Sequence, residues 1–295
     1  MKRTLLVGLV AALVACRPSK SPIAALDVST REIHLAWPQS TEIELGLVPS
    51  APLPKGVDHP ILFVHLLDEP GSVVRTFDHE LRGAWKPGAE LRDRHRIFQS
   101  ALAAPLPAGH YLLTVGLYDL QLGRFALSTR APEITQEEYQ VATVEVPTTS
   151  AAGPEAHFSG DWLAPEPSSD RQVVASRRLR GGAPGTIGFG PLAGPGTIFL
   201  GLVVPGASGT GSRLELNDGA LQPKVKVSSS CGGQQSEVTG TGRFDFELQV
   251  PAAAPPASCE VVIEPNFVIS LGDRAETISI RLEELSYRPG AGGDS

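Results

Sequence analysis

The sequence predicts an all-β protein built from β-sandwich domains. Short segments in which apolar and polar residues alternate recur along most of the chain, and a period of two is typical of strands with one buried face. Glycine and proline are frequent, 31 and 26 of 295 residues, and many fall between these segments, as turns require. From Asp27 to Pro147 no stretch carries a helical period over three turns.

The first half predicts an immunoglobulin-like sandwich over residues 27–147. Residues 61–67 are apolar on both faces and fit a central strand, and the Asp-Glu-Pro-Gly sequence at 68–71 is typical of a turn. In residues 111–117 every second side chain is apolar, which predicts one inward face. The strands expected here cover residues 33–37, 43–47, 61–67, 73–77, 91–99, 111–117 and 141–146.

The second half predicts a jelly-roll-like sandwich over residues 157–288. The clearest strand covers residues 244–250, in which Phe, Phe, Leu and Val alternate with charged or polar residues. The strands expected here cover residues 158–163, 186–189, 197–204, 213–216, 225–227, 244–250, 259–264 and 277–285.

Length and composition favour two domains. Removing a 15-residue leader from 295 residues leaves 280, more than one domain usually holds, and 41% hydrophobic residues suffice for two cores. Residues 148–156 lack apolar periodicity and are the predicted linker, and residues 289–295 are a predicted disordered tail.

The chain opens with a predicted export signal over residues 1–15. Lys2 and Arg3 supply its positive charge, and the apolar stretch 5–14 is too short to cross a bilayer as a helix. The residues at 13–16, Leu-Val-Ala-Cys, resemble the lipobox of bacterial lipoproteins. An ordinary secretory signal with an incidental cysteine is the alternative.

The lipobox resemblance implies that Cys16 becomes the mature N-terminus and carries acyl chains such as palmitate. Residues 16–26 would then form a tether between the lipid and the first domain. We expect a lipid-anchored protein of the bacterial cell envelope, at the periplasmic or surface face of the outer membrane. Arg17 is not the aspartate that retains some lipoproteins at the inner membrane.

The remaining cysteines predict a disulfide. With Cys16 acylated, only Cys231 and Cys259 remain, an even pair in a chain exported to an oxidising compartment. A metal site is the weaker alternative, because two thiols without CxxC spacing do not supply four ligands.

Charge argues against nucleic acid as a partner. Loss of Lys2 and Arg3 leaves 23 basic residues (25 − 2) against 32 acidic ones, a net charge of −9. A nucleic-acid surface is normally basic, so we expect attachment to the membrane through lipid alone.

Part of the first half resembles a known accessory domain. Four stretches carry the resemblance: residues 62–68, Trp-Lys-Pro-Gly at 85–88, Asp-Arg-His at 93–95, and residues 107–119. They are similar to a β-sandwich domain often appended to bacterial membrane glycosyltransferases of the dolichyl-phosphate-mannose mannosyltransferase type. The resemblance covers residues 58–127 and implies a fold and an envelope setting, but no transferase activity.

Catalytic motifs are missing from the sequence. There is no Walker loop, GxSxG, HExxH or CxxC, and the histidines are scattered, with His79 between Asp78 and Glu80 the nearest to an acid–base cluster. We therefore expect no enzyme, no cofactor and no metal, although the turns at 68–69 and 217–218 leave calcium open. The alternative is a hydrolase of envelope polysaccharide with paired carboxylates.

The expected function is that of a binding or assembly module for a glycan or an envelope protein. Trp85, Tyr118 and Trp162 are the candidate sugar contacts, because a flat aromatic face matches the apolar face of a pyranose. Packing of each ring against its own sandwich is the alternative, as is a purely architectural subunit that docks by its sheet edges.

Changing Cys16 to Ser should release the protein from membranes, because it removes the acylation site that the lipobox defines. Two or three acyl chains give lasting attachment, at about 0.8 kcal/mol for each buried methylene. Fractionation after a high-salt wash measures the effect. A variant still wholly bound to membranes would reject lipid anchoring as the main attachment.

Overall fold

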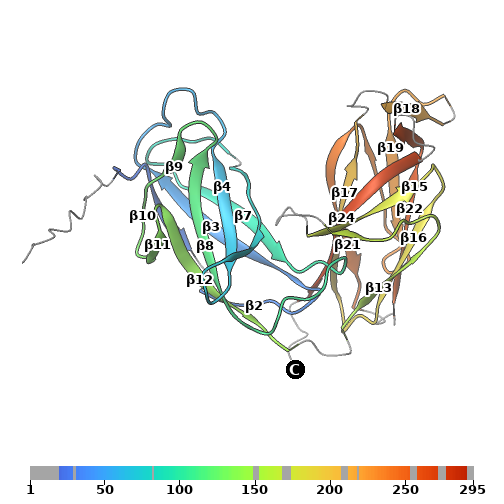
Figure 1. Ribbon diagram of the computed structural model, residues 1–295, viewed down its shortest axis with the longest axis horizontal. Coiled ribbons are helices and arrows are strands. Elements are labelled where there is room, and N and C mark those ends of the chain that lie inside the picture. Colours follow the sequence, from blue (N-terminus) through green and yellow to red (C-terminus); the bar gives the residue numbers. More distant parts are fainter. Residues whose placement is uncertain are drawn as a thin grey trace, which may run out of the picture.

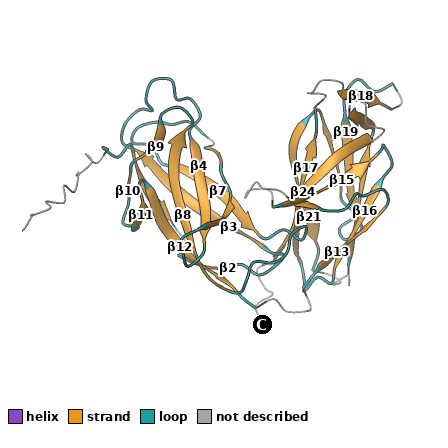
Figure 2. Ribbon diagram, viewed as in Figure 1, coloured by secondary structure: helices purple, strands orange, loops and turns teal. Residues whose placement is uncertain are grey.

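The computed structural model describes residues 20–28, 31–81, 83–148, 153–167, 174–206, 212–217, 219–252, 258–271 and 277–290. All regular secondary structure in these ranges is β-strand, apportioned among several sheets (Figures 1 and 2). The predicted all-β class is confirmed. The described chain contains no helix that could cross a membrane.

The first half contains two sheets. One has the strand order β10-β1-β3-β7, and the other has the order β11-β12-β8-β4-β5, with β2 paired to β12, β6 to β4 and β9 to β8. The bounds of these strands are β1 (Ala24–Val28), β2 (Glu32–His34), β3 (Ser40–Pro49), β4 (Ile61–Leu67), β5 (Val73–Thr76), β6 (His79–Glu80), β7 (Leu91–Phe98), β8 (Gly109–Asp119), β9 (Gly123–Phe125), β10 (Leu127–Ser128), β11 (Glu133–Thr135) and β12 (Glu138–Val146).

Alternation along the strands builds the core of the first half. Tyr111, Leu113, Val115 and Leu117 of β8 are all buried in it, as the sequence predicted. They pack with Ile43, Leu45 and Leu47 of β3, so the core is shared by side chains of both sheets. Face-to-face packing of this kind removes the apolar face of each sheet from water.

The second half also contains two sheets. The strand orders are β13-β16-β22-β19-β20 and β14-β15-β24-β17-β21, and the β18/β23 pair joins the latter through β24. The bounds are β13 (Glu155–Ser159), β14 (Glu166–Pro167), β15 (Ala175–Arg180), β16 (Gly185–Gly190), β17 (Gly196–Val204), β18 (Ser212–Leu216), β19 (Lys224–Ser229), β20 (Gln235–Thr239), β21 (Gly242–Val250), β22 (Cys259–Pro265), β23 (Phe267–Leu271) and β24 (Thr277–Pro289).

The expected disulfide is present in the second half. Cys231 follows β19 and Cys259 begins β22, and the disulfide brings their Cα atoms to 5.3 Å. Cys259 is fully buried in the second core, so the bond fixes the loop before β20 to the interior.

Several element boundaries differ from the sequence prediction. β1 begins at Ala24, inside the predicted tether 16–26, because Ala24 and Leu26 are buried against the first core. β13 begins at Glu155, inside the predicted linker 148–156, and pairs with β16. β24 reaches Pro289, one residue into the predicted tail. The strand expected over 33–37 ends at His34.

The two halves contact each other through the segment that follows β7. The N–H of Ala101 donates to the carbonyl of Leu285 at 2.7 Å, and Leu102 is buried in the core of the second half. From the other side, the N–H of Tyr287 donates to the carbonyl of Pro38 at 3.0 Å. Main-chain bonds in both directions thus join β24 to the first half.

A buried ion pair adds to this contact. Arg96 of β7 donates to both carboxylate oxygens of Glu284 at 3.1 and 3.0 Å, and Glu284 is 1% exposed. The guanidinium of Arg96 lies 4.0 Å from the ring centroid of Phe199 in β17. Glu284 also contacts Arg243 and Ser286 of its own half, so Arg96 joins an existing cluster and adds a charged contact between the two halves.

Removal of the disulfide should lower the free energy of unfolding by about 3 to 4 kcal/mol in the chain-entropy model, given a sequence separation of 28. Chemical denaturation of the native protein and of the Cys231→Ala/Cys259→Ala variant measures the difference. Reductant should destabilise the first and leave the second unchanged. Equal denaturation midpoints for the two proteins would contradict a stabilising role.

Candidate functional site

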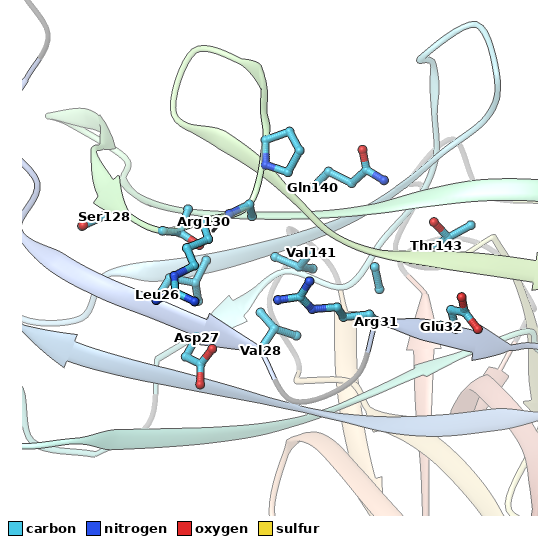
Figure 3. A pocket seen from close by; sticks show the side chains of 14 residues that line it. Leu26, Asp27, Val28, Arg31, Glu32, Ser128, Arg130, Gln140, Val141 and Thr143 are labelled. Carbon is cyan, nitrogen blue, oxygen red and sulfur yellow. Dashed lines mark hydrogen bonds between the residues drawn. The ribbon is translucent and has the colours of Figure 1, made fainter.

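A polar hollow opens at the edge of the first half, where β1 of one sheet lies near β12 of the other (Figure 3). Its volume is about 820 Å³, within the range of small-molecule sites. Its lining comes from β1, β12, residues 31–32 at the start of β2, and residues 128–132, which run from the end of β10 toward β11. Four segments that are separate in the sequence therefore contribute to one concave surface.

The hollow exists because neighbouring strands separate here. β10 pairs with β1 only at Ala24 and Ala25, so residues 26–28 have no ladder partner on that side within the described chain. On β12, the N–H of Gln140 donates to Pro132 and the N–H of Thr143 donates to Arg31, at 2.9 Å each. These bonds attach two segments to β12, the one that contains Pro132 and the one that contains Arg31, on either side of Val141 and Ala142.

Two arginines reach into this region from separate turns. Arg31 precedes β2 and Arg130 precedes β11, and Figure 3 shows both side chains extending toward β1. Neither guanidinium makes an ion pair or side-chain hydrogen bond with a described residue, and both are exposed. Most other described arginines donate to a carboxylate or a carbonyl, as Arg124 does to Glu138.

The rest of the lining combines polar and apolar groups. Leu26 and Val141 are buried and give the hollow an apolar base, whereas Gln140 and Thr143 present an amide and a hydroxyl. The carboxylates of Asp27 and Glu32 also line it, and they are exposed. The surface can bind a polar ligand that carries negative charge, hydroxyl groups and some apolar area.

A second charged cluster lies on the outer face of the larger sheet of the first half. His65 contacts Glu138 through Nδ1 at 3.3 Å and Asp78 through Nε2 at 3.4 Å. Arg124 donates to Glu138 at 3.1 Å and lies 4.6 Å above the ring of Phe63. Every ionic group in this cluster is therefore already paired.

These contacts shift the pKa values of His65 and Glu138. Burial disfavours the charged form of His65, but the hydrogen bonds and charges of Asp78 and Glu138 outweigh it and raise its pKa to about 9. The hydrogen bond from His65 is the main cause that lowers the pKa of Glu138 to about 2, supported by the hydroxyls of Thr114 and Thr135. His65 is thus a cation near neutral pH, suited to stabilising the sheet rather than to accepting a proton.

His79 does not form an acid–base cluster with its neighbours in sequence. Its Nε2 contacts Asp93 of β7 at 2.8 Å, and its ring stacks on His95 at 3.9 Å. Asp78 contacts His65 instead. The His79–Asp93 pair links β6 of one sheet to β7 of the other, a connection that joins the two layers.

The three predicted sugar contacts lie apart and are half-buried. The indole of Trp85 donates to the carbonyl of Ala51 at 2.9 Å and packs against the first core. Tyr118 lies 6.1 Å from the ring of Phe63, and Trp162 packs edge-on to Phe158 at 5.4 Å. None of the three rings contacts another in the described chain, so they do not form one platform. A role for each in sugar binding stays a prediction.

The remaining predicted sites are the lipidation site and the two turns considered for calcium. Cys16 and Asp218 lie outside the described residues. The carboxylate of Asp68 accepts the N–H of Ser72 at 2.7 Å within its own turn. Among the described residues, no three His, Cys, Asp or Glu side chains group as metal ligands.

Arg31 and Arg130 were not predicted from the sequence as site residues. They are far apart in the chain, and each is a single basic residue in a turn without a motif. Only the separation of β10 from β1 brings their turns to the same hollow. No local signal in the sequence indicates this.

Comparison with known proteins gives little guidance. No family model and no curated protein matches the chain. Among solved structures, it is similar to a 4-O-methyl-α-glucuronidase specific for decorated arabinogalactans (TM-score 0.28, 11% identity, 53% of this chain and 20% of that one). An arabinose-bound α-L-arabinofuranosidase (0.26, 15%, 45% and 23%) and tripeptidyl peptidase 2 (0.24, 12%, 91% and 21%) are others.

The chain thus spans about a fifth of the length of these structures. At such low TM-scores, the likeness carries no argument about function.

The shifted pKa values predict how stability depends on pH. A raised pKa of His65 gives stability that is complete below about pH 6.5 and is lost as the pH rises to about 9. The lowered pKa of Glu138 gives stability that is complete above about pH 4.5 and is lost as the pH falls toward about 2.

Changing His65 to Gln should therefore flatten the decrease in melting temperature between pH 6.5 and 9. The exposed His110 offers a matched control, since it makes no contact with a described carboxylate. A melting series against pH for wild type, His65→Gln and His110→Gln tests this. An identical pH profile for wild type and His65→Gln would contradict the assigned ion pairs.

Proposed function

We propose that this chain is a lipid-anchored, non-catalytic binding module of the bacterial cell envelope, whose ligand site is the hollow between β1 and β12. The observation that carries the proposal is that Arg31 and Arg130, two guanidiniums without an ion pair to any described residue, lie on one concave polar surface. Such groups are available to a ligand without breaking an existing bond.

The composition of the lining supports binding rather than catalysis. The described lining holds hydroxyls and carboxylates but no histidine, cysteine, tyrosine or lysine, so its serine and threonines have no neighbouring imidazole or amine to activate them. Both His65 and His79 contact carboxylates elsewhere in the first half. The hollow offers hydrogen-bond donors and charge, which determine affinity and orientation.

A hydrolase is the second candidate, and one observation favours it. Asp27 and Glu32 both line the hollow, and glycoside hydrolysis uses two carboxylates. The general acid of such enzymes usually sits in an apolar pocket, whereas both of these side chains are exposed. Binding without turnover is therefore the better supported function.

Anchoring through Cys16 fits this function. Lys20 already contacts the first half, with its ammonium 3.0 Å from Glu137. Four residues span at most about 14 Å, so acylated Cys16 would keep the hollow near the membrane surface. Tethering raises the effective concentration of the module near envelope ligands, and modest affinity then suffices.

A glycan array probed with the mature chain carrying Cys16→Ser tests the proposal. We expect binding to at least one envelope glycan, lost in the Arg31→Ala/Arg130→Ala variant and kept in Arg180→Ala. Arg180 is a matched control, because it is exposed and also lacks a described side-chain partner.

Binding that is unchanged in the double variant would place the site elsewhere. Release of shortened glycan from the array would favour the hydrolase. Melting temperatures close to that of wild type would show that the variants are folded.

A further inference from the structure

We infer that the hollow binds the carboxylate of a uronic acid, so that the ligand class is an acidic glycan. This inference rests on the proposed function and specifies its ligand. It depends on Arg31 and Arg130, on the neutral polar groups beside them and on the short free edge of β1.

The two arginines select a carboxylate. A guanidinium presents its N–H donors in a planar fork that matches the two oxygens of a carboxylate, and it remains charged at any physiological pH. Arg31 and Arg130 come from two separate segments, those before β2 and β11, and both extend toward β1 (Figure 3). An anionic group over β1 would have donors on two sides.

The neighbouring groups suit a hydroxylated ring. Gln140 and Thr143 of β12 can donate to and accept from sugar hydroxyls, and neither side chain makes a described hydrogen bond. Leu26 and Val141 are almost fully buried at the base of the hollow and present a small apolar area to the C–H face of a pyranose. A uronic acid carries all three features in one residue: a carboxylate, hydroxyls and an apolar face.

The acidic groups of the lining disfavour dense polyanions. Asp27 and Glu32 offset the formal charge of the two arginines, and the whole chain is acidic, at −7. A sulfated glycan or a nucleic acid would bring many charges close to these carboxylates. A uronate oligomer carries one charge on each sugar, fewer than a sulfated glycan, so fewer of its charges would lie close to Asp27 and Glu32.

The free strand edge is too short for an acidic peptide. Addition of a peptide strand relies on a series of main-chain hydrogen bonds along an open edge. Beyond its pairing with β10, β1 offers only residues 26–28. The edge of β12 is bridged at Gln140 and Thr143 by the carbonyls of Pro132 and Arg31. A compact sugar unit fits this interrupted edge better.

Calorimetric titration of the mature chain carrying Cys16→Ser tests the inference. The probes are oligomers of galacturonate, mannuronate and unsulfated glucuronate, the methyl-esterified form of each, and poly-glutamate. We expect at least one uronate oligomer to bind, its ester to bind about ten- to a hundredfold more weakly, and added salt to reduce affinity.

Arg31→Gln and Arg130→Gln should each weaken binding of the acid about tenfold or more, while Arg180→Gln leaves it unchanged. Their affinity for the ester should change little, and this difference separates loss of the carboxylate contact from unfolding. Equal affinity for acid and ester would overturn the inference while leaving a glycan-binding module in place. Tighter binding of poly-glutamate would identify an acidic peptide instead. Failure of all three uronates would also overturn it, and the array then decides separately whether any glycan binds.

Discussion

The pairing of β10 with β1 ends after Ala25, and the hollow with its two arginines depends on this separation. Beyond that point the edge of β1 turns to solvent, and the chain to β11 follows the rim of a hollow. Arg130 lies on that rim, and Arg31 leads into β2 on the other side. Continued pairing of β10 with β1 would close this edge and leave no concave surface.

The two halves contact each other, but the hollow is lined by residues of the first half alone. Arg96, Glu284 and Phe199 form a packed group between them, and Leu102 is buried in the second core. Figure 1 shows β10 and β11 on the side of the first half that faces away from the second. A ligand at the hollow would therefore approach without contacting the second half (Figure 1).

The fold could be predicted from the sequence to a greater extent than the site. Alternation in residues 111–117 and 244–250 indicates buried faces, because a strand has a period of two whatever its partners are. Strand ends were less predictable: Ala24 and Glu155 lie in stretches without strong periodicity, and pairing with distant strands extends β1 and β13 to them. Cys231 and Cys259 could be paired because the lipobox resemblance assigns Cys16 to acylation and leaves only these two thiols. Arg31 and Arg130 could not be predicted as site residues, because only the tertiary structure places them at one hollow.

The most direct measurement is the NMR spectrum of the mature chain carrying Cys16→Ser, titrated with a uronate oligomer that binds. The arginine Nε–Hε signals report on each guanidinium separately. We predict that the signals of Arg31 and Arg130 shift, together with the amides of residues 26–28 and 140–143, while that of Arg180 stays fixed. Shifts confined to Trp85, Tyr118 or Trp162, with both arginine signals unmoved, would contradict it.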